Sequence, residues 1–282
     1  MVEIFFHIGL GKTGTKYLQS EFFPKLNGVK YIKPQLYKNA IEIISDEIIK
    51  NQKSLKKRKI LLSREFDKQL ETETLRFSKF FPNTRIIVVF RRHDEWILSQ
   101  FKRTLKNGYH IKFSEFFNFE NTGIFKIQDL IYRKKIEHIK NTFSEQPLIL
   151  TYDEFKNNPS NFLIKISEYV GATFEEKSIP KKFVHKSYGE KELKYSYIIS
   201  KFIDYKPRNN PIQKYLYVFP IRYSILYLGR FLPEPKTKEK VFPEREELEK
   251  IREFFKDDWN FCVQESLNSE KLCNLKHQKS HE

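Results

Sequence analysis

Residues 7–19 read HIGLGKTGTKYLQ, and this stretch decides the fold. It follows the apolar run Val2–Ile8 and precedes a helical pattern that begins near Tyr17. A strand–loop–helix junction of this kind points several backbone N–H groups, and the positive end of a helix dipole, at one place. Lys12 adds a mobile positive charge there. The stretch therefore predicts a binding site for a phosphate or sulfate ester.

The loop matches only the second half of a Walker A motif, which reads G-x-x-x-x-G-K-[ST]. Residues 11–13 fit, but the first glycine of that motif would fall on Phe6. A nucleoside triphosphate site also needs a carboxylate that holds magnesium at the end of a later strand. The run Arg85–Phe90 ends instead in Arg91 and Arg92, which favours an anion bound without a metal ion.

Five short runs rich in isoleucine and valine are typical of buried parallel strands. They are Val2–Ile8, Val29–Lys33, Ile60–Ser63, Arg85–Phe90 and Leu148–Thr151. Helical patterns separate them, and this alternation predicts an α/β fold, a parallel sheet flanked by helices on both faces. Ligands of such sheets bind beyond the carboxyl ends of the strands, where the loop falls. We expect this core to span residues 1–190, and a helical region packed on it in the same domain to span residues 191–282.

The bulk composition narrows the class of protein. With 282 residues, 39% of them hydrophobic, the chain is long enough for one large domain. No apolar run reaches the length of about 20 residues that a transmembrane helix needs. A strand that carries Glu3 begins at once, so we expect no signal peptide and a cytoplasmic location. Cys262 and Cys273 lack the spacing of a zinc site or a disulfide framework, which predicts free thiols.

The charge balance predicts an anionic partner. Lysine and arginine number 52 and aspartate and glutamate 36, which gives a net charge of +16. A nucleotide, an acidic glycan, an anionic lipid and a nucleic acid all fit such a charge. No RNA- or DNA-binding motif is present, so we expect no nucleic-acid partner, and only the charge supports a basic nucleic-acid-binding module as an alternative.

The loop is similar to the 5′-phosphosulfate loop of sulfotransferases that use 3′-phosphoadenosine 5′-phosphosulfate (PAPS). Their bacterial and carbohydrate-acting members commonly read K-T-G-T-T-x-L-Q. Ser99 follows Arg91 by eight residues, the separation at which an arginine and a serine of that family bind the 3′-phosphate. Residues 148–159, LILTYDEFKNNP, resemble the family's strand followed by Y-E-D-L-x-x-x-P, and residues 248–259 resemble its closing helix. The resemblance implies a P-loop NTPase-like sulfotransferase fold.

The resemblance also implies roles for single residues. Lys12 is expected to stabilise charge at the bridging oxygen and the 5′-phosphate, and Glu65 to act as the base, with His7 and His93 as weaker candidates. His7 is expected rather to be packed and hydrogen-bonded, and His93 to contact the nucleotide. The expected nucleotide-binding residues are Gly11, Lys12, Thr13, Gly14, Thr15, Lys16, Arg91, Ser99, Lys186 and Ser187. Lys16, His93 and Trp96 depart from the family pattern.

These roles together describe an enzyme that needs no metal and moves a sulfuryl group from PAPS to an acceptor hydroxyl, with 3′,5′-adenosine bisphosphate (PAP) as product. The glutamate base and the K-T-G-T loop favour a saccharide or glycolipid acceptor. A P-loop kinase-like phosphotransferase and a catalytically silent scaffold are competing interpretations. The segment Ile212–Leu232, rich in Tyr, Phe, Leu and Ile, is expected to pack on the core, to cover the acceptor site, or to make peripheral membrane contact.

Overall fold

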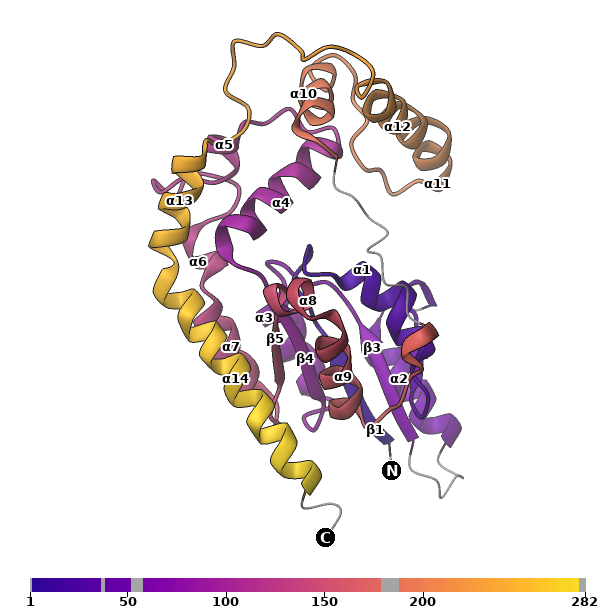
Figure 1. Ribbon diagram of the computed structural model, residues 1–282. Coiled ribbons are helices and arrows are strands. Elements are labelled where there is room, and N and C mark those ends of the chain that lie inside the picture. The colour runs from indigo at the N-terminus through magenta and orange to yellow at the C-terminus, as the bar shows by residue number, and fades with distance from the viewer. Residues whose placement is uncertain (1, 37–38, 52–57, 179–187, 279–282) are drawn as a thin grey trace. The chain divides into compact units, whose positions relative to one another are not determined.

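The computed structural model describes residues 2–36, 39–51, 58–178 and 188–278 (Figure 1). Contacts divide the chain into two units. The first unit holds the described residues of Met1–Arg92, Ile131–Val184 and Lys256–Glu282, and the second those of His93–Leu130 and His185–Phe255. The expected division into a core of residues 1–190 and a helical region of residues 191–282 in the same domain stays a prediction.

A five-stranded parallel sheet with the order β2-β3-β1-β4-β5 forms the centre of the first unit. Its strands are β1 (Val2–His7), β2 (Lys30–Ile32), β3 (Arg58–Ser63), β4 (Arg85–Phe90) and β5 (Leu148–Thr151). Each strand coincides at least in part with one of the predicted runs, and β3 begins two residues before the run Ile60–Ser63. The chain runs from β1 to the edge strand β2, returns to β3 beside β1, and then crosses to β4 on the other side of β1, with β5 outside β4. The connections that leave β1 and β4 thus run to opposite sides. The sheet therefore has a topological switch point between β1 and β4, beyond which such sheets bind ligands.

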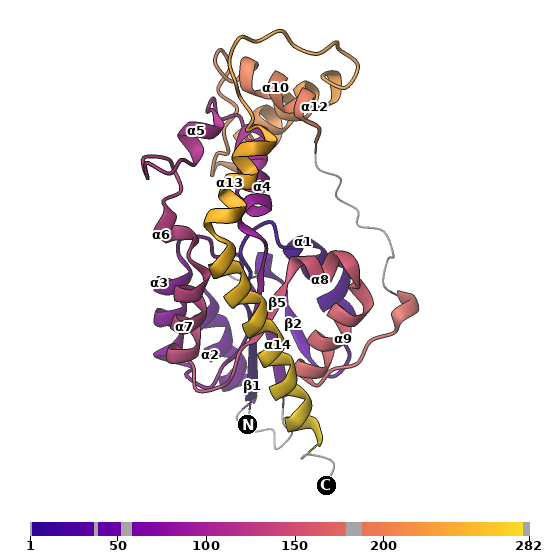
Figure 2. The same ribbon diagram turned by 60° about the vertical axis from the view of Figure 1, so that its left-hand side comes forward.

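Helices cover both faces of this sheet (Figure 2). One face is covered by α1 (Thr15–Tyr17), which continues into the π-helical turn Leu18–Phe22, and by α8 (Tyr152–Asn157) and α9 (Pro159–Val170). Apolar side chains of these helices form one buried cluster with side chains of β1, β3, β4 and β5. Burial of this apolar surface is the main stabilising contribution on this side of the sheet.

The opposite face is covered by α3 (Leu70–Ser78) and α7 (Tyr132–Thr142). The rings of Phe6 and Phe77 meet at 4.9 Å between centroids, and those of Phe90 and Tyr132 at 4.7 Å. Phe6, where a Walker A motif would begin, is therefore a packed residue inside β1. The predicted fold class, a parallel α/β sheet with helices on both faces, is confirmed, and it is consistent with a P-loop-like fold.

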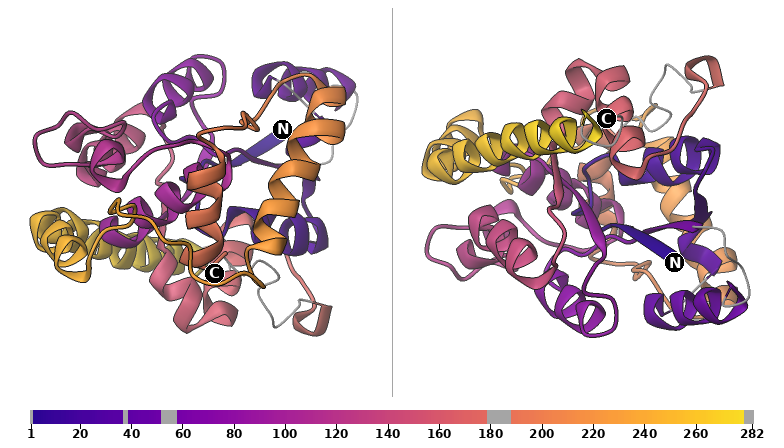
Figure 3. Two further views of the ribbon diagram at one scale, coloured as in Figure 1. Left: turned by 90° about the horizontal axis from the view of Figure 1, so that it is seen from above. Right: turned by 90° about the horizontal axis from the view of Figure 1, so that it is seen from below.

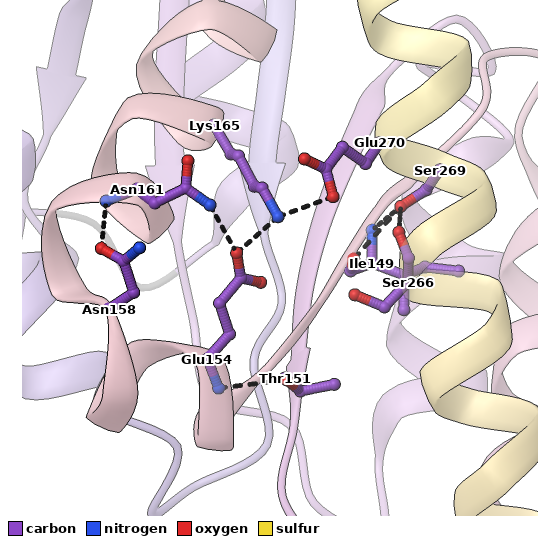
Figure 4. Close-up of polar contacts among 9 residues, drawn as sticks. All are labelled: Ile149, Thr151, Glu154, Asn158, Asn161, Lys165, Ser266, Ser269 and Glu270. Carbon is purple, nitrogen blue, oxygen red and sulfur yellow. Dashed lines mark hydrogen bonds and ion pairs between the residues drawn. The ribbon is translucent and has the colours of Figure 1, made fainter.

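A long helix, α14 (Lys256–Gln278), packs against β5 and α7 in the first unit (Figure 3). The Ser269 hydroxyl donates to the Ile149 carbonyl at 3.1 Å and accepts from the Ile149 N–H at 3.2 Å (Figure 4). These contacts satisfy backbone groups on the outer edge of the sheet. Lys165 of α9 joins Glu154 of α8 to Glu270 of α14, at 2.5 and 2.7 Å. The C-terminal helix is thus held to the sheet by polar as well as apolar contacts.

In the described residues of the second unit, all regular secondary structure is helical. They are α4 (His93–Lys106), α5 (Phe113–Phe116), α6 (Ile127–Leu130), α10 (Glu190–Ile199), α11 (Pro211–Gln213), the π-helical turn Lys214–Val218, α12 (Phe219–Leu228) and α13 (Arg245–Phe254). Helix α10 packs against α4 and α12, and α13 packs against α4. The helical character expected after residue 190 is confirmed, whereas its packing on the α/β core stays a prediction.

Shorter elements complete the described chain. They are α2 (Ala40–Asn51) and the 3-10 turns Phe23–Lys25, Pro34–Leu36 and Glu176–Ser178. The closing helix expected over residues 248–259 belongs to two helices, because Phe255 between α13 and α14 leaves helical geometry with φ −95° and ψ 11°. Among the described residues, none of the helices combines the length and the apolar character that crossing a membrane requires.

Candidate functional site

The loop that follows β1 has the backbone geometry of an anion cradle. Lys12 has a φ of 69° and Gly14 a φ of 86°, so two left-handed residues flank Thr13. A positive φ is uncommon for a residue other than glycine. Left-handed residues that alternate with others turn neighbouring N–H groups toward a common point, and such concave backbone binds anions. The helix that begins at Thr15 adds the N–H groups of its first turn.

Neighbouring side chains leave no room for a Cβ atom at two loop glycines. A Cβ on Gly14 would lie 2.7 Å from the Phe155 ring, and one on Gly9 would lie 2.8 Å from His7 Nε2. Thr13 is fully buried, and its hydroxyl donates to the Leu10 carbonyl at 2.6 Å. The loop is therefore held in one conformation by packing and by its own hydrogen bonds.

The chain that follows β3 runs beside this loop. The Arg64 N–H donates to the His7 carbonyl at 2.9 Å, and the Phe66 N–H donates to the Gly9 carbonyl at 3.2 Å. Glu65, the expected base, lies between these two bonds with its side chain exposed. The next acid, Asp67, accepts the Gly11 N–H at 2.8 Å through Oδ1. The backbone of Glu65 is thus fixed next to the loop, and Asp67 is a loop partner that sequence reasoning missed.

We expect Asp67→Ala to loosen the loop. The change removes the acceptor of the Gly11 N–H, and loss of a charge-assisted hydrogen bond costs about 1.5–3 kcal/mol. The free energy of unfolding in urea and the affinity for PAP, measured by calorimetry, should both fall. The control is Asp46→Ala, which removes an exposed carboxylate from α2. Equal losses in the two variants would contradict a role for Asp67 in holding the loop.

Arg91 reaches the same loop from the end of β4. Its Nη1 donates to the Lys12 carbonyl at 3.2 Å, and its guanidinium lies 4.5 Å from the centroid of the Tyr152 ring. The Tyr132 hydroxyl donates to the Arg91 carbonyl at 2.7 Å, and burial is the largest cause that raises the pKa of Tyr132 well above its usual value. The structure therefore brings Arg91 and Lys12 together beyond the β1–β4 switch point.

Asp258 extends this network to α14. Its carboxylate accepts the Tyr132 N–H at 2.7 Å and the Arg133 N–H at 2.9 Å. These N–H groups belong to the first turn of α7, where helical partners are lacking. The carboxylate therefore caps α7 from another helix and fixes Tyr132, which in turn holds the backbone of Arg91.

The other predicted nucleotide-binding residues lie in the first unit, in the second unit or outside the described residues. Thr15 is buried at the start of α1, and the Lys16 side chain is exposed. Ser99 lies on α4, in the second unit, so a phosphate shared by Arg91 and Ser99 stays a prediction. Lys186 and Ser187 lie outside the described residues.

His7 is a packed residue, as expected. Its ring is fully buried, and Nδ1 forms a 2.8 Å hydrogen bond with the Ser63 hydroxyl, which also accepts the Gln19 side-chain amide at 2.9 Å. Among the described residues no hydrogen-bond partner meets Nε2, which faces Gly9. Burial lowers the pKa of His7 to about 3, so the ring is neutral beneath the loop at neutral pH.

We expect His7 to make stability depend on pH. Because its pKa is about 3 in the folded chain and the ordinary value of 6.5 applies in the unfolded chain, the unfolded chain binds more protons between these values. Stability should therefore fall as pH drops below 6.5, by about 2 kcal/mol at pH 5 relative to neutral pH. Urea unfolding of the wild type and His7→Asn at both pH values measures this difference. The same substitution at half-buried His138 is the control, and an unchanged pH dependence in His7→Asn would contradict the assignment.

His93 and Trp96 are used in packing within the second unit. The His93 ring is stacked on Phe255 with centroids 4.4 Å apart, and its Nε2 donates to the Leu130 carbonyl at 3.0 Å. Trp96 is buried edge-to-face on Phe125 at 5.2 Å. We expected a nucleotide contact for His93, but its ring is instead buried among apolar neighbours. The two departures from the family pattern thus have a structural explanation.

Other features bear on cofactors and thiols. Within the described part of the chain, no group of three or more His, Cys, Asp or Glu side chains could hold a metal ion.

Cys262 is a buried free thiol, and burial raises its pKa well above the usual value. The prediction of a free thiol is confirmed for Cys262, while the Cys273 side chain lies outside the described side chains.

Several chains of solved structures are similar to this chain. No protein-family model and no curated protein sequence matches the chain. A sulfotransferase from Alicyclobacillus acidocaldarius matches with 13% identity and a TM-score of 0.47, over 70% of this chain and 92% of that one. A likeness at this level does not bear on activity, so the proposal below rests on the geometry of the loop and its neighbours.

Proposed function

We propose that the chain is a PAPS-dependent sulfotransferase, which moves a sulfuryl group to a hydroxyl of a saccharide or glycolipid. The observation that carries this proposal is the pairing of the anion cradle at Lys12 and Gly14 with Arg91. The cradle and the arginine follow adjacent strands, so two anionic groups of one nucleotide can be held on either side of the switch point. Arginine suits a phosphate because its fork grips two oxygens at once.

The residues of this chain fit such a nucleotide. The N–H groups of residues 14–16 are suited to hold the 5′-phosphosulfate, since a left-handed Gly14 precedes the first turn of a helix. Arg91 is suited to bind the 3′-phosphate, because the Tyr152 ring and the Lys12 carbonyl hold its guanidinium in place. When bound, PAPS supplies the activated sulfuryl group.

The protein's part in the reaction is proton transfer and stabilisation of charge. Glu65 takes the proton of the acceptor hydroxyl, whose oxygen forms the new bond to sulfur. Lys12 stabilises the negative charge that develops as the bond from sulfur to the bridging oxygen breaks and PAP leaves. Two backbone hydrogen bonds hold the chain on either side of Glu65, and another joins the Gly11 N–H to Asp67. These bonds keep the position of the base constant relative to the cradle.

Thermal stabilisation by PAP, compared with ATP plus magnesium, tests the proposal. We expect PAP to raise the melting temperature of the wild type and to have little effect on Arg91→Ala, which loses a bidentate phosphate contact worth about 1.5–3 kcal/mol. Arg76→Ala, at an exposed position of α3, is the control and should respond as the wild type does. Stabilisation by ATP plus magnesium alone would favour a kinase-like enzyme, and stabilisation by neither nucleotide would favour a silent scaffold.

A further inference from the structure

The helical segment 211–228 of the second unit carries apolar side chains on two sides. Ile225 and Leu226 of α12 are buried, and α12 packs against α10 (Figure 1). Pro211 lies in the first turn of α11, and Pro220 directly follows the π-helical turn that joins α11 to α12, so the segment is helical throughout. A helix with a second apolar side needs a second apolar surface to cover it.

Aromatic rings form a stripe along this segment and just beyond its end. We define the aromatic stripe as Tyr215, Phe219, Tyr223, Tyr227 and Phe231, which are spaced by four residues, so that successive rings are neighbours. Phe219 is half-buried and the other four are exposed. Neighbouring rings meet edge to face, with centroids 5.4 Å apart for 215–219, 5.7 Å for 219–223 and 5.2 Å for 227–231. Phe231 exposes 72% of its surface and Tyr215 60%.

Aliphatic side chains extend this surface. Leu216 is 76% exposed and Ile212 is 68% exposed, and Leu228 and Leu232 are exposed as well. Apolar surface gathered on one element in this way marks an interaction site rather than ordinary scattered exposure. Tyrosine combines an apolar ring with a polar tip, which suits a boundary between water and an apolar phase.

The charged side chains of residues 205–233 are all positive, namely Lys206, Arg208, Lys214, Arg222 and Arg230. Arg208 and Arg230 form ion pairs with Asp204 and Glu192 outside this range, at 3.5 and 3.6 Å, and Arg222 is buried. The Lys214 ammonium lies 5.5 Å from the centroid of the Tyr215 ring and 5.4 Å from that of Phe219, at the margin of the stripe. Arg208 lies similarly over Tyr217 at 5.4 Å. Positive charge therefore borders the apolar surface directly.

We propose that the aromatic stripe docks on a membrane surface that contains anionic phospholipid. The rings and the neighbouring leucines enter the interfacial region, and the cations at the margin meet the lipid phosphates. Basic helices with large apolar side chains bind membranes in this way, in the plane of the interface and without crossing it. An anionic bilayer supplies both the apolar phase and the negative charge that this face requires. The proposal does not depend on sulfuryl transfer.

Co-sedimentation of the full chain with vesicles tests this docking. We expect binding to vesicles of phosphatidylcholine with phosphatidylglycerol, weak binding to phosphatidylcholine alone, and weaker binding at high salt. Leu216→Glu and Phe231→Glu should each lower binding more than about tenfold, because each places a carboxylate in the interface. Lys206→Gln with Lys214→Gln should lower it by roughly twenty- to thirtyfold, about fivefold for each cation.

Matched variants separate docking from general effects. Leu75→Glu and Phe80→Glu change exposed apolar side chains of the first unit, and Lys79→Gln removes an exposed cation there, so all three should bind as the wild type does. Tryptophan placed at position 216 should be quenched by brominated lipid, and tryptophan at position 75 should not. Absence of vesicle binding, equal losses in the control variants, or a stable dimer that Leu216→Glu dissociates without lipid would each overturn the proposal.

Discussion

Lys12→Ala should lower the rate of sulfuryl transfer from PAPS by about 10²–10³-fold, the largest effect on activity that we expect from one side chain. The lysine lies in a loop whose backbone already has anion-binding geometry, with φ of 69° at Lys12 itself. In the proposed mechanism this charge acts on the bond that breaks, so its loss should reduce kcat more than it weakens nucleotide binding. Turnover is measured with labelled PAPS against a panel of saccharide and glycolipid acceptors.

The design of this experiment separates charge from structure. Lys79→Ala removes an exposed lysine from the first unit and should keep full turnover. Lys12→Gly is a second variant, which also removes the side chain but adopts the positive φ at this position without steric cost. Both position-12 variants should be similarly slow. Full activity in either of them would remove the basis of the proposed mechanism.

Gly14→Ala should cause the largest loss of stability and of nucleotide binding together. The backbone at Gly14 has a φ of 86°, and a Cβ would lie 2.7 and 2.9 Å from two carbon atoms of the Phe155 ring. Left-handed geometry costs about 1–2 kcal/mol for alanine, and overpacking adds about 1–3 kcal/mol. We therefore expect the free energy of unfolding to fall by about 2–5 kcal/mol and the PAP-induced thermal shift to disappear.

Gly28 provides a control with the same backbone and an open neighbourhood. Its φ is 87°, but the nearest atom to a Cβ added at this position is the Gly171 carbonyl oxygen at 3.9 Å. Gly28→Ala should therefore show only the backbone cost of about 1–2 kcal/mol and bind PAP normally. If the two alanine variants were equally unstable, contact with Phe155 would not be what fixes the loop.

The sheet and the loop were predictable because their signals are local. All five strands lie where short runs of branched residues occur, and β4 and β5 match their predicted bounds, Arg85–Phe90 and Leu148–Thr151. The cradle could be located because Gly14 and its neighbours follow a strand and precede a helix within a few residues. The pattern of apolar residues along a short stretch indicates such an element without knowledge of its distant contacts.

The helical segment 211–228 shows where local reasoning was limited. Pro211 lies in a first helical turn, where a missing N–H costs nothing, whereas Pro220 directly follows a π-helical turn inside a continuous helical stretch. Composition indicated an apolar segment, but which of its side chains remain exposed depends on how α12 packs against α10. The aromatic stripe is therefore a property of that packing.

Local patterns in the sequence were enough to locate the parallel α/β sheet, the loop that follows β1 and the strand end that carries Arg91. Only the tertiary structure decided that Asp67 accepts the Gly11 N–H from 56 residues away and that Arg91 bonds to the Lys12 carbonyl. The reason is physical. Periodicity and residue type act over one turn or one strand, whereas these contacts depend on strand order and register, which the packing of the whole sheet decides.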